Sequence, residues 1–216
     1  MSKKIIAFSQ NIKINQYQEI EDCLNIRWTE FIDKLNFLPL QIPTMCNNNV
    51  EQYFKNINIQ GVILTGGNDV YYKSSKNNNS NSLSKKRNNL ERKILEICIK
   101  NEVPVLGVCR GMQFINVFFG GKLSKLECHS AKEKHKIINC EKKTYKFPQK
   151  VNTFHNYGIP QGSNSKLIKI LAIDEDKNIE AFSYDEKKIL GIMWHPERDK
   201  PFNKIDLNLV KRFFSD

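Results

Sequence analysis

The sequence lacks the long apolar segments that membrane and exported proteins carry. Its 216 residues contain no apolar run of the roughly 18 residues that a membrane span needs. The first ten residues, MSKKIIAFSQ, lack the apolar core of a signal peptide. We therefore expect a cytoplasmic protein without a membrane partner, in which the six cysteines stay reduced.

Metal and nucleic-acid motifs are also missing. The cysteines form no C-x-x-C pair, so a structural zinc site is not expected, and no metal is assigned. No known nucleic-acid motif accompanies the basic residues, and aromatic residues are not interleaved with them. Nucleic acid is therefore not the expected partner, although a basic binding module with an inert cysteine stays open as an alternative.

The composition is that of an ordinary globular protein, with 40% hydrophobic and 26% charged residues. The length suits one substantial core and is short for two independent domains, so we expect a single domain over residues 1–216.

Positive charge is concentrated in two segments. Residues 73–100 hold eight Lys or Arg against two Glu, and residues 122–150 hold nine Lys against three Glu. One interpretation is a solvated surface, and another is a basic rim that attracts a phosphorylated or otherwise anionic substrate. The sequence leaves both open.

Apolar spacing predicts alternating strands and helices through the first half of the chain, which is typical of an α/β fold. We expect a largely parallel central sheet with helices on both faces. A polar, asparagine-rich surface loop is expected over residues 73–84, with Ser84 capping the next helix. The expected strands cover 3–10, 37–43, 60–69 and 103–108, and the expected helices 17–35, 50–59, about 85–98, 110–119 and 204–214, with short strands and loops between the last two.

The segment Gly107-Val108-Cys109-Arg110-Gly111 follows a continuous apolar strand and precedes a helical pattern. G-x-C-x-G is the sulfur counterpart of the nucleophile elbow, a sharp strand-to-helix turn that exposes one side chain. The glycines allow a tight turn without clashes, and the helix N-terminus favours a thiolate. A buried structural cysteine is the plainer alternative, but the combined pattern favours a nucleophile.

Trp194-His195-Pro196-Glu197 follows another apolar strand. A thiol nucleophile needs a base, and the base needs an acceptor that orients it. On an extended segment His195 and Glu197 point to the same side, so the carboxylate is expected to hold the imidazole.

A third motif, Thr65-Gly66-Gly67-Asn68-Asp69, ends a buried strand. Paired glycines let backbone N–H groups approach a ligand closely, as an oxyanion hole requires. By itself the pair is weak evidence, since most such pairs are only turns.

Together T-G-G-N-D, C-R-G-M-Q, V-N-T-F-H-N-Y-G and W-H-P-E resemble, in order and spacing, the class I glutamine amidotransferase-like superfamily, and within it the free-standing γ-glutamyl hydrolases related to γ-glutamyl-γ-aminobutyrate hydrolase. The resemblance implies a flavodoxin-like fold and a cofactor-free hydrolase that acts through a γ-glutamyl thioester without an obligate protein partner. The roles implied for this chain are Cys109 as nucleophile, His195 as acid and base, Glu197 as orienting residue, Gly67 and Arg110 as backbone donors of the oxyanion hole, and Gly66, Gln113, His155 and Asn156 as substrate-binding residues.

Two departures narrow the resemblance. Asn68 to Tyr72 lack the proline-containing segment of that branch, and His155-Asn156 stands where it tends to have two histidines. The short chain, W-H-P-E-R and a Trp28-bearing first helix are more similar to the γ-glutamyl-CDP-amidate hydrolases of capsule phosphoramidate synthesis, whose nucleotide-linked small-molecule substrate would suit the basic segments. The alternatives are a γ-glutamyl-γ-aminobutyrate or other γ-glutamyl amine hydrolase, and a glutaminase subunit that feeds ammonia to a partner synthetase.

Overall fold

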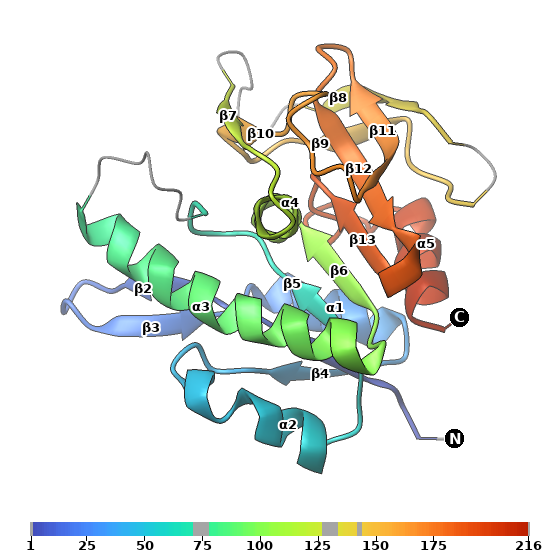
Figure 1. The fold of residues 1–216 in the computed structure, drawn as a ribbon. Coiled ribbons are helices and arrows are strands. Elements are labelled where there is room, and N and C mark those ends of the chain that lie inside the picture. Colours follow the sequence, from blue (N-terminus) through green and yellow to red (C-terminus); the bar gives the residue numbers. More distant parts are fainter. Residues whose placement is uncertain (1, 71–77, 127–133, 142–143, 216) are drawn as a thin grey trace.

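The computed structural model describes residues 2–70, 78–126, 134–141 and 144–215. Its main feature is a nine-stranded mixed sheet with strand order β4-β1-β5-β6-β13-β12-β11-β8-β9 (Figure 1). The first five strands in this order run parallel to one another and the remaining four are antiparallel. The bounds are β1 Ile5–Phe8, β4 Leu38–Gln41, β5 Ile59–Leu64, β6 Val105–Val108, β8 Lys134–Asn139, β9 Lys150–Asn152, β11 Lys169–Asp174, β12 Ile179–Tyr184 and β13 Ile189–Ile192.

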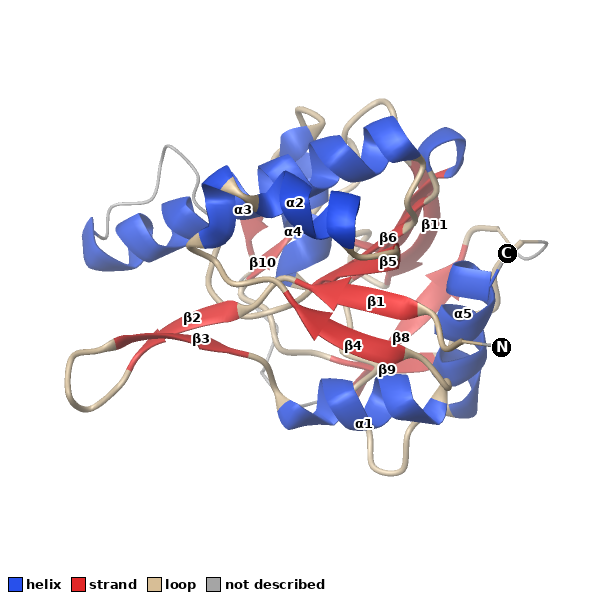
Figure 2. Ribbon diagram, turned by 90° about the horizontal axis from the view of Figure 1, so that it is seen from below, coloured by secondary structure: helices blue, strands red, loops and turns tan. Residues whose placement is uncertain are grey.

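Helices cover both faces of the sheet (Figure 2). The helices are α1 Ile26–Lys34 and α5 Lys204–Ser215 on one face, and α2 Val50–Asn56, α3 Asn78–Asn101 and α4 Arg110–Phe118 on the other. Each face has its own apolar core: Trp28, Phe31 and Phe214 belong to the first, and Leu90, Ile94 and Met112 to the second. The α/β prediction with a parallel core and two covered faces is confirmed.

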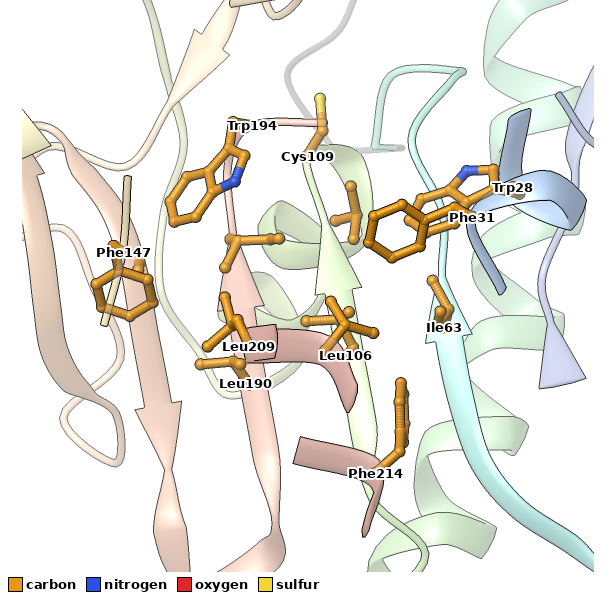
Figure 3. Close-up of a cluster of buried hydrophobic side chains, with 14 of the residues drawn as sticks. Trp28, Phe31, Ile63, Leu106, Cys109, Phe147, Leu190, Trp194, Leu209 and Phe214 are labelled. Atoms are coloured by element: carbon orange, nitrogen blue, oxygen red, sulfur yellow. The ribbon is translucent and has the colours of Figure 1, made fainter. Parts of the chain in front are cut away.

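The parallel strands bring the predicted motifs to one edge of the sheet. β5 pairs with β6 through Leu64 and Gly107, and β6 pairs with β13 through Val108 and Ile192. Because parallel strands end at the same edge, the segments that follow these three strands meet there. The core cluster of Figure 3 lies beneath this edge, and the Cys109 sulfur points away from Leu106 and Ile63.

The N-terminal region differs from its prediction. Residues 17–35 were expected to form one helix, but the chain first forms a β-hairpin of β2 (Asn11–Ile14) and β3 (Ile20–Cys23), and only then α1. Ile20, assigned to the apolar helix face, is exposed on β3, whereas Trp28, Phe31 and Ile32 are buried as expected. The hairpin projects from the body of the molecule, so local apolar spacing carried no sign of it (Figure 2).

The asparagine-rich region also differs. Residues 73–77 lie outside the described residues, but α3 already begins at Asn78, so the loop prediction for 78–84 is wrong. Ser84 is buried inside α3 and does not cap it. The polar residues of this region have no helical periodicity of apolar side chains, so no sequence pattern indicated that α3 begins this early.

Small elements complete the described chain. They are the pair β7 (Ser124–Lys125) and β10 (Tyr157–Gly158) and the single-turn helices Cys46–Asn48 and Asp185–Lys187. None of the described helices is both long and apolar enough to cross a bilayer.

Candidate active site

Cys109 sits in the sharp turn between β6 and α4. Its backbone has φ +52° and ψ −106°, a conformation that residues other than glycine rarely adopt. Such a conformation costs on the order of 1–3 kcal/mol and persists only where the surrounding structure enforces it. Here β13 helps to hold it, because the Cys109 N–H donates to Ile192 O at 2.8 Å. The turn has the form of a nucleophile elbow, but the expected exposure of its side chain is wrong, because Cys109 is buried.

The two flanking glycines permit close approach and not the turn itself, since neither has a positive φ. A Cβ on Gly111 would lie 2.0 Å from the carbonyl oxygen of Leu64, and one on Gly107 would lie 2.5 Å from the Ile115 side chain. Both contacts are far inside van der Waals distance. The glycines therefore let α4 pack directly on the ends of β5 and β6, which puts the helix N-terminus under the cysteine.

His195 and Glu197 are both buried and lie together at the end of β13. The Nδ1 atom of His195 is 2.7 Å from Oε1 of Glu197. The expected pairing is present, but its predicted geometry is wrong: the segment is not extended. It turns after His195, so that the Arg198 N–H donates to His195 O at 3.1 Å, and this turn brings the carboxylate back to the ring.

The imidazole of His195 interacts with both Glu197 and Cys109. Burial lowers the pKa of His195, but the negative charges of Glu197 and Cys109 and hydrogen bonds to both outweigh it and raise this pKa to about 9. Because Nδ1 faces Glu197, the opposite nitrogen, Nε2, is the one available to the thiol. The three side chains thus form one connected line at the sheet edge.

Residues that the motifs did not single out hold this line in place. The Asn152 side chain accepts a hydrogen bond from the His195 N–H and donates one to His195 O, each at 2.9 Å. The preceding residue, Trp194, donates its indole N–H to Asp206 at 3.0 Å. Burial raises the pKa of Asp206 to about 7. Asn152 belongs to the V-N-T-F-H-N-Y-G motif, which was the only signal available for it.

The glycine pair after β5 lies against the same histidine. A Cβ on Gly66 would be 2.4 Å from Cε1 of His195, so only glycine fits beside the ring. Gly67 has φ +121°, which favours glycine, and it is exposed. Gly66 is therefore a packing partner of the imidazole, a contact that the sequence did not predict.

Arg87 of α3 holds the glycine loop by its carbonyl groups. Its guanidinium donates to Gly66 O at 2.9 Å and to Thr65 O at 2.6 Å. Across a trans peptide the C=O and the next N–H point in opposite directions. Since the Gly66 carbonyl points to Arg87, the N–H of Gly67 points away from it.

A buried carboxylate balances Arg87. Glu91, one turn further along α3, accepts from Arg87 Nε at 2.9 Å, from the Ser9 hydroxyl at 2.8 Å and from the guanidinium of Arg110. Burial raises the pKa of Glu91, but the two arginines outweigh it and the net shift is downward. Burial, aided by Arg110, lowers the pKa of Arg87 to about 10. The α3 segment expected to be a basic surface thus contributes an internal ion-pair network.

Gln113 and His155 meet at one backbone group. The Gln113 side chain donates to the carbonyl oxygen of Tyr157 at 2.7 Å, and Nδ1 of His155 lies 3.0 Å from the same oxygen. Nε2 of His155 is 3.9 Å from Glu180. Asn156, between them in the chain, is exposed. The structure therefore brings Gln113 and His155 together on the α4 side of the site.

A cavity of about 210 Å³ opens on the other side of His195. Its wall is formed by the glycine loop, the β2–β3 hairpin, the start of α1 and the turn after β13, and it includes Lys13, Trp28, Gly67, His195 and Arg198. Neither cation of this wall lies in the two basic segments. A larger cavity of about 570 Å³, between α5 and residues 144–146, contains none of the predicted site residues.

Among the described residues, no three His, Cys, Asp or Glu side chains converge in a way that could hold a metal ion. The arrangement instead joins a cysteine, a histidine and a glutamate to a glycine loop and a helix N-terminus. These groups are the ones that thiol-dependent acyl transfer requires.

Comparison with known proteins gives a consistent family. A family model described as peptidase C26 matches residues 4–197. A γ-glutamyl-CDP-amidate hydrolase from Campylobacter jejuni is 35% identical over 214 residues, which covers 97% of each chain. A subunit of the glutamine-hydrolysing GMP synthase from Methanococcus vannielii is 28% identical over 152 residues, covering 70% of this chain and 71% of that protein.

Solved structures show the same fold at lower identity. A glutamine amidotransferase from Thermotoga maritima aligns with a TM-score of 0.70 at 16% identity, covering 99% of both chains. A putative GMP synthase subunit from Thermoplasma acidophilum also has a TM-score of 0.70, at 17% identity, over 98% of this chain and 92% of that one.

Proposed function

The chain belongs to the peptidase C26 family of γ-glutamyl hydrolases, and we propose that it cleaves the amide bond of γ-glutamyl-CDP-amidate or a close analogue and releases L-glutamate. The observation that carries the chemistry is the line from Cys109 through His195 to Glu197, with 2.7 Å between the last two. The relative from Campylobacter jejuni, similar along the whole chain, supports the substrate. A role in capsule phosphoramidate synthesis stays a prediction from the sequence resemblance.

Cys109 is the proposed nucleophile. Its turn places the sulfur at the N-terminus of α4, so the positive end of the helix dipole lies next to the attacking atom. The raised pKa of His195 keeps the imidazole protonated beside the sulfur. Glu197 holds Nδ1 and so directs Nε2 to the reacting groups.

The backbone N–H groups of Gly67 and Arg110 are the proposed oxyanion donors. Arg110 is the first residue of α4, so its N–H has no acceptor within the helix. The N–H of Gly67 is turned away from Arg87 by the hydrogen bond to the preceding carbonyl. A preorganised pair of this kind contributes roughly 10²–10³ in kcat per donor.

The glutamyl end of the substrate is proposed to bind on the α4 side. Gln113 and His155, which meet at the Tyr157 carbonyl, order the segment that carries the exposed Asn156. These groups would hold the α-amino and α-carboxylate ends of the substrate.

The reaction then proceeds in two balanced steps. The Cys109 thiolate attacks the γ-carbonyl carbon, and the carbonyl electron pair moves to oxygen. As that pair returns, the C–N bond breaks and Nε2–H of His195 gives its proton to the leaving nitrogen. Water, deprotonated by the now neutral Nε2, attacks the γ-glutamyl thioester and expels the thiolate with L-glutamate.

The test is glutamate release from purified protein with γ-glutamyl-CDP-amidate, γ-glutamyl-γ-aminobutyrate and glutamine as substrates. We expect the first to be preferred, and Cys109→Ala to reduce turnover by about 10⁴-fold or more. Mass spectrometry of a rapidly quenched reaction should show one γ-glutamyl group on Cys109. The matched control is Cys98→Ala, because Cys98 is buried on α3 and burial raises the pKa of its thiol.

Full turnover by Cys109→Ala would exclude the mechanism. A preference for γ-glutamyl-γ-aminobutyrate would keep the mechanism and change the substrate.

A glutaminase role is the second candidate, favoured by the similarity to the GMP synthase subunit from Methanococcus vannielii. That similarity covers 70% of this chain, whereas the hydrolase similarity covers 97% of both chains. Glutamine hydrolysis that rises only when a synthetase is added would support it. We expect substrate turnover by the purified chain alone.

A further inference from the structure

The cavity of about 210 Å³ is lined in part by His195, the residue proposed to protonate the leaving nitrogen. This inference rests on the proposed function, in which Nε2 of His195 protonates the leaving nitrogen. The cavity wall includes Gly66, Gly67 and His195 but neither Gln113 nor His155, which lie toward the glutamyl end. A group that fills this cavity is therefore attached to the nitrogen and not to the glutamyl carbon chain.

Two cations face this cavity from different elements. Lys13 lies on β2 of the projecting hairpin and is exposed. Glu21 is opposite Lys13 on β3, but its carboxylate accepts a hydrogen bond from Asn15 at 2.8 Å. No ion pair of Lys13 is formed within the described ranges of the chain. Its ammonium group is thus free to meet an anion.

Arg198 is the second cation, and its guanidinium contacts one aromatic ring and one carboxylate. It stacks over the Phe154 ring at 4.2 Å from the ring centre, and its Nε is 3.6 Å from Oε1 of Glu197. The same Glu197 oxygen is already paired with His195 Nδ1, and only Nε of Arg198 lies near it, so Glu197 does not occupy the other N–H groups of the guanidinium. The planar guanidinium keeps N–H groups for a phosphate.

The start of α1 adds to this positive field. Asn25, the N-cap of α1, lines the cavity, and the first turn of the nine-residue helix contains no acidic residue. The positive end of the helix dipole therefore faces the cavity without a compensating carboxylate in that turn. Glu197 is the carboxylate of the wall, and it is paired with His195.

We propose that Lys13 and Arg198 form an anion subsite that binds the phosphoryl group attached to the leaving nitrogen. In a γ-glutamyl nucleoside diphosphoramidate the amide nitrogen is bonded directly to phosphorus, so the phosphoryl oxygens lie only two bonds beyond the nitrogen of the scissile amide. The subsite thus selects substrates whose leaving amine carries a phosphate, and it distinguishes this chain from a hydrolase of neutral γ-glutamyl amines.

The experiment compares kcat/KM for γ-glutamyl-CDP-amidate and for glutamine in the wild type, Lys13→Ala and Arg198→Ala. The ratio of the two constants should fall about tenfold or more in each variant, because each loses one charge close to the phosphate. Lys34→Ala, an exposed lysine at the far end of α1, is the matched control and should keep the wild-type ratio.

Binding of cytidine 5′-diphosphate to the Cys109→Ala protein gives a readout without turnover. Lys13→Ala in that background should weaken binding about tenfold, added salt should weaken it further, and cytidine should bind poorly to all forms. An unchanged ratio together with unchanged nucleotide affinity overturns the subsite. A wild type that hydrolyses no γ-glutamyl amide but still binds the nucleotide through Lys13 overturns the proposed function instead.

Discussion

Substituting Gly66 by alanine tests how closely the glycine loop and the proposed base are fitted. Gly66 has no positive φ, so alanine fits its backbone, and the new methyl group is the whole perturbation. That Cβ would lie 2.4 Å from Cε1 and 3.2 Å from Nε2 of His195. Ordinary contact begins at 3.4 Å, so the ring must move by about 1 Å.

The imidazole cannot make that movement freely. Its backbone is held by two hydrogen bonds to Asn152, its Nδ1 by Glu197, and the Phe154 ring packs edge-on at 5.6 Å between ring centres. A misplacement of about 1 Å at a reacting group costs on the order of 10²-fold in rate. We therefore expect kcat of Gly66→Ala to fall roughly 100-fold, with a loss of about 1–3 kcal/mol in the free energy of unfolding from overpacking.

The assay is steady-state glutamate release, accompanied by urea unfolding of the same preparations. Gly120→Ala is the control, because no atom lies within 4 Å of the new methyl group while its φ of +88° imposes a stability cost of about 1 kcal/mol. Its kcat should equal that of the wild type. Should Gly66→Ala keep kcat within threefold of the wild type, the fit of His195 against the glycine loop would not matter for the reaction.

Two further predictions concern the groups around this loop. Arg87→Met removes the donors to Thr65 O and Gly66 O, so kcat should fall by at least tenfold while KM changes little. The free energy of unfolding, measured with urea, should drop by about 3–5 kcal/mol. Wild-type kcat in a folded Arg87→Met protein would contradict the positioning role. Because the pKa of His195 is raised from 6.5 to about 9, the stabilisation from its charged form is complete below pH 6.5 and is lost as pH rises through about 9. The kcat/KM profile should fall over the same upper pH range, and Glu197→Gln should move this fall to lower pH. An unmoved profile would show that Glu197 does not raise the pKa of His195.

Prediction from sequence worked best where neighbouring residues carry the information. The buried strand before Cys109 and the apolar spacing of α4 are local signals, and both elements are present as expected. The hairpin before α1 was missed because its exposed side chains share the spacing of an amphipathic helix. The early start of α3 was missed because its first turns are polar, and tertiary position outweighs weak propensity.

The candidate site divides in a similar way. Cys109, His195 and Glu197 stand in short motifs, so their residue types and spacing were sufficient to select them. Arg87 and Asn152 act on the site through partners 21 and 43 residues away in the chain, and no local pattern marks such contacts. Arg87, in the first basic segment, is buried in an ion-pair network, whereas Lys13 and Arg198, which line the cavity, lie outside both basic segments.

The amino-acid sequence alone determined the kind of chemistry to expect, since a nucleophile elbow and a His-x-Glu segment each need only a few consecutive residues. The tertiary structure decided which groups support that chemistry and what lies beyond the scissile bond. Parallel strands of different sequence position end at one edge, so the glycine loop, the hairpin and the start of α1 meet around His195. Packing across the sheet and the hairpin brings these groups together, and the spacing of residues along a single strand does not predict it.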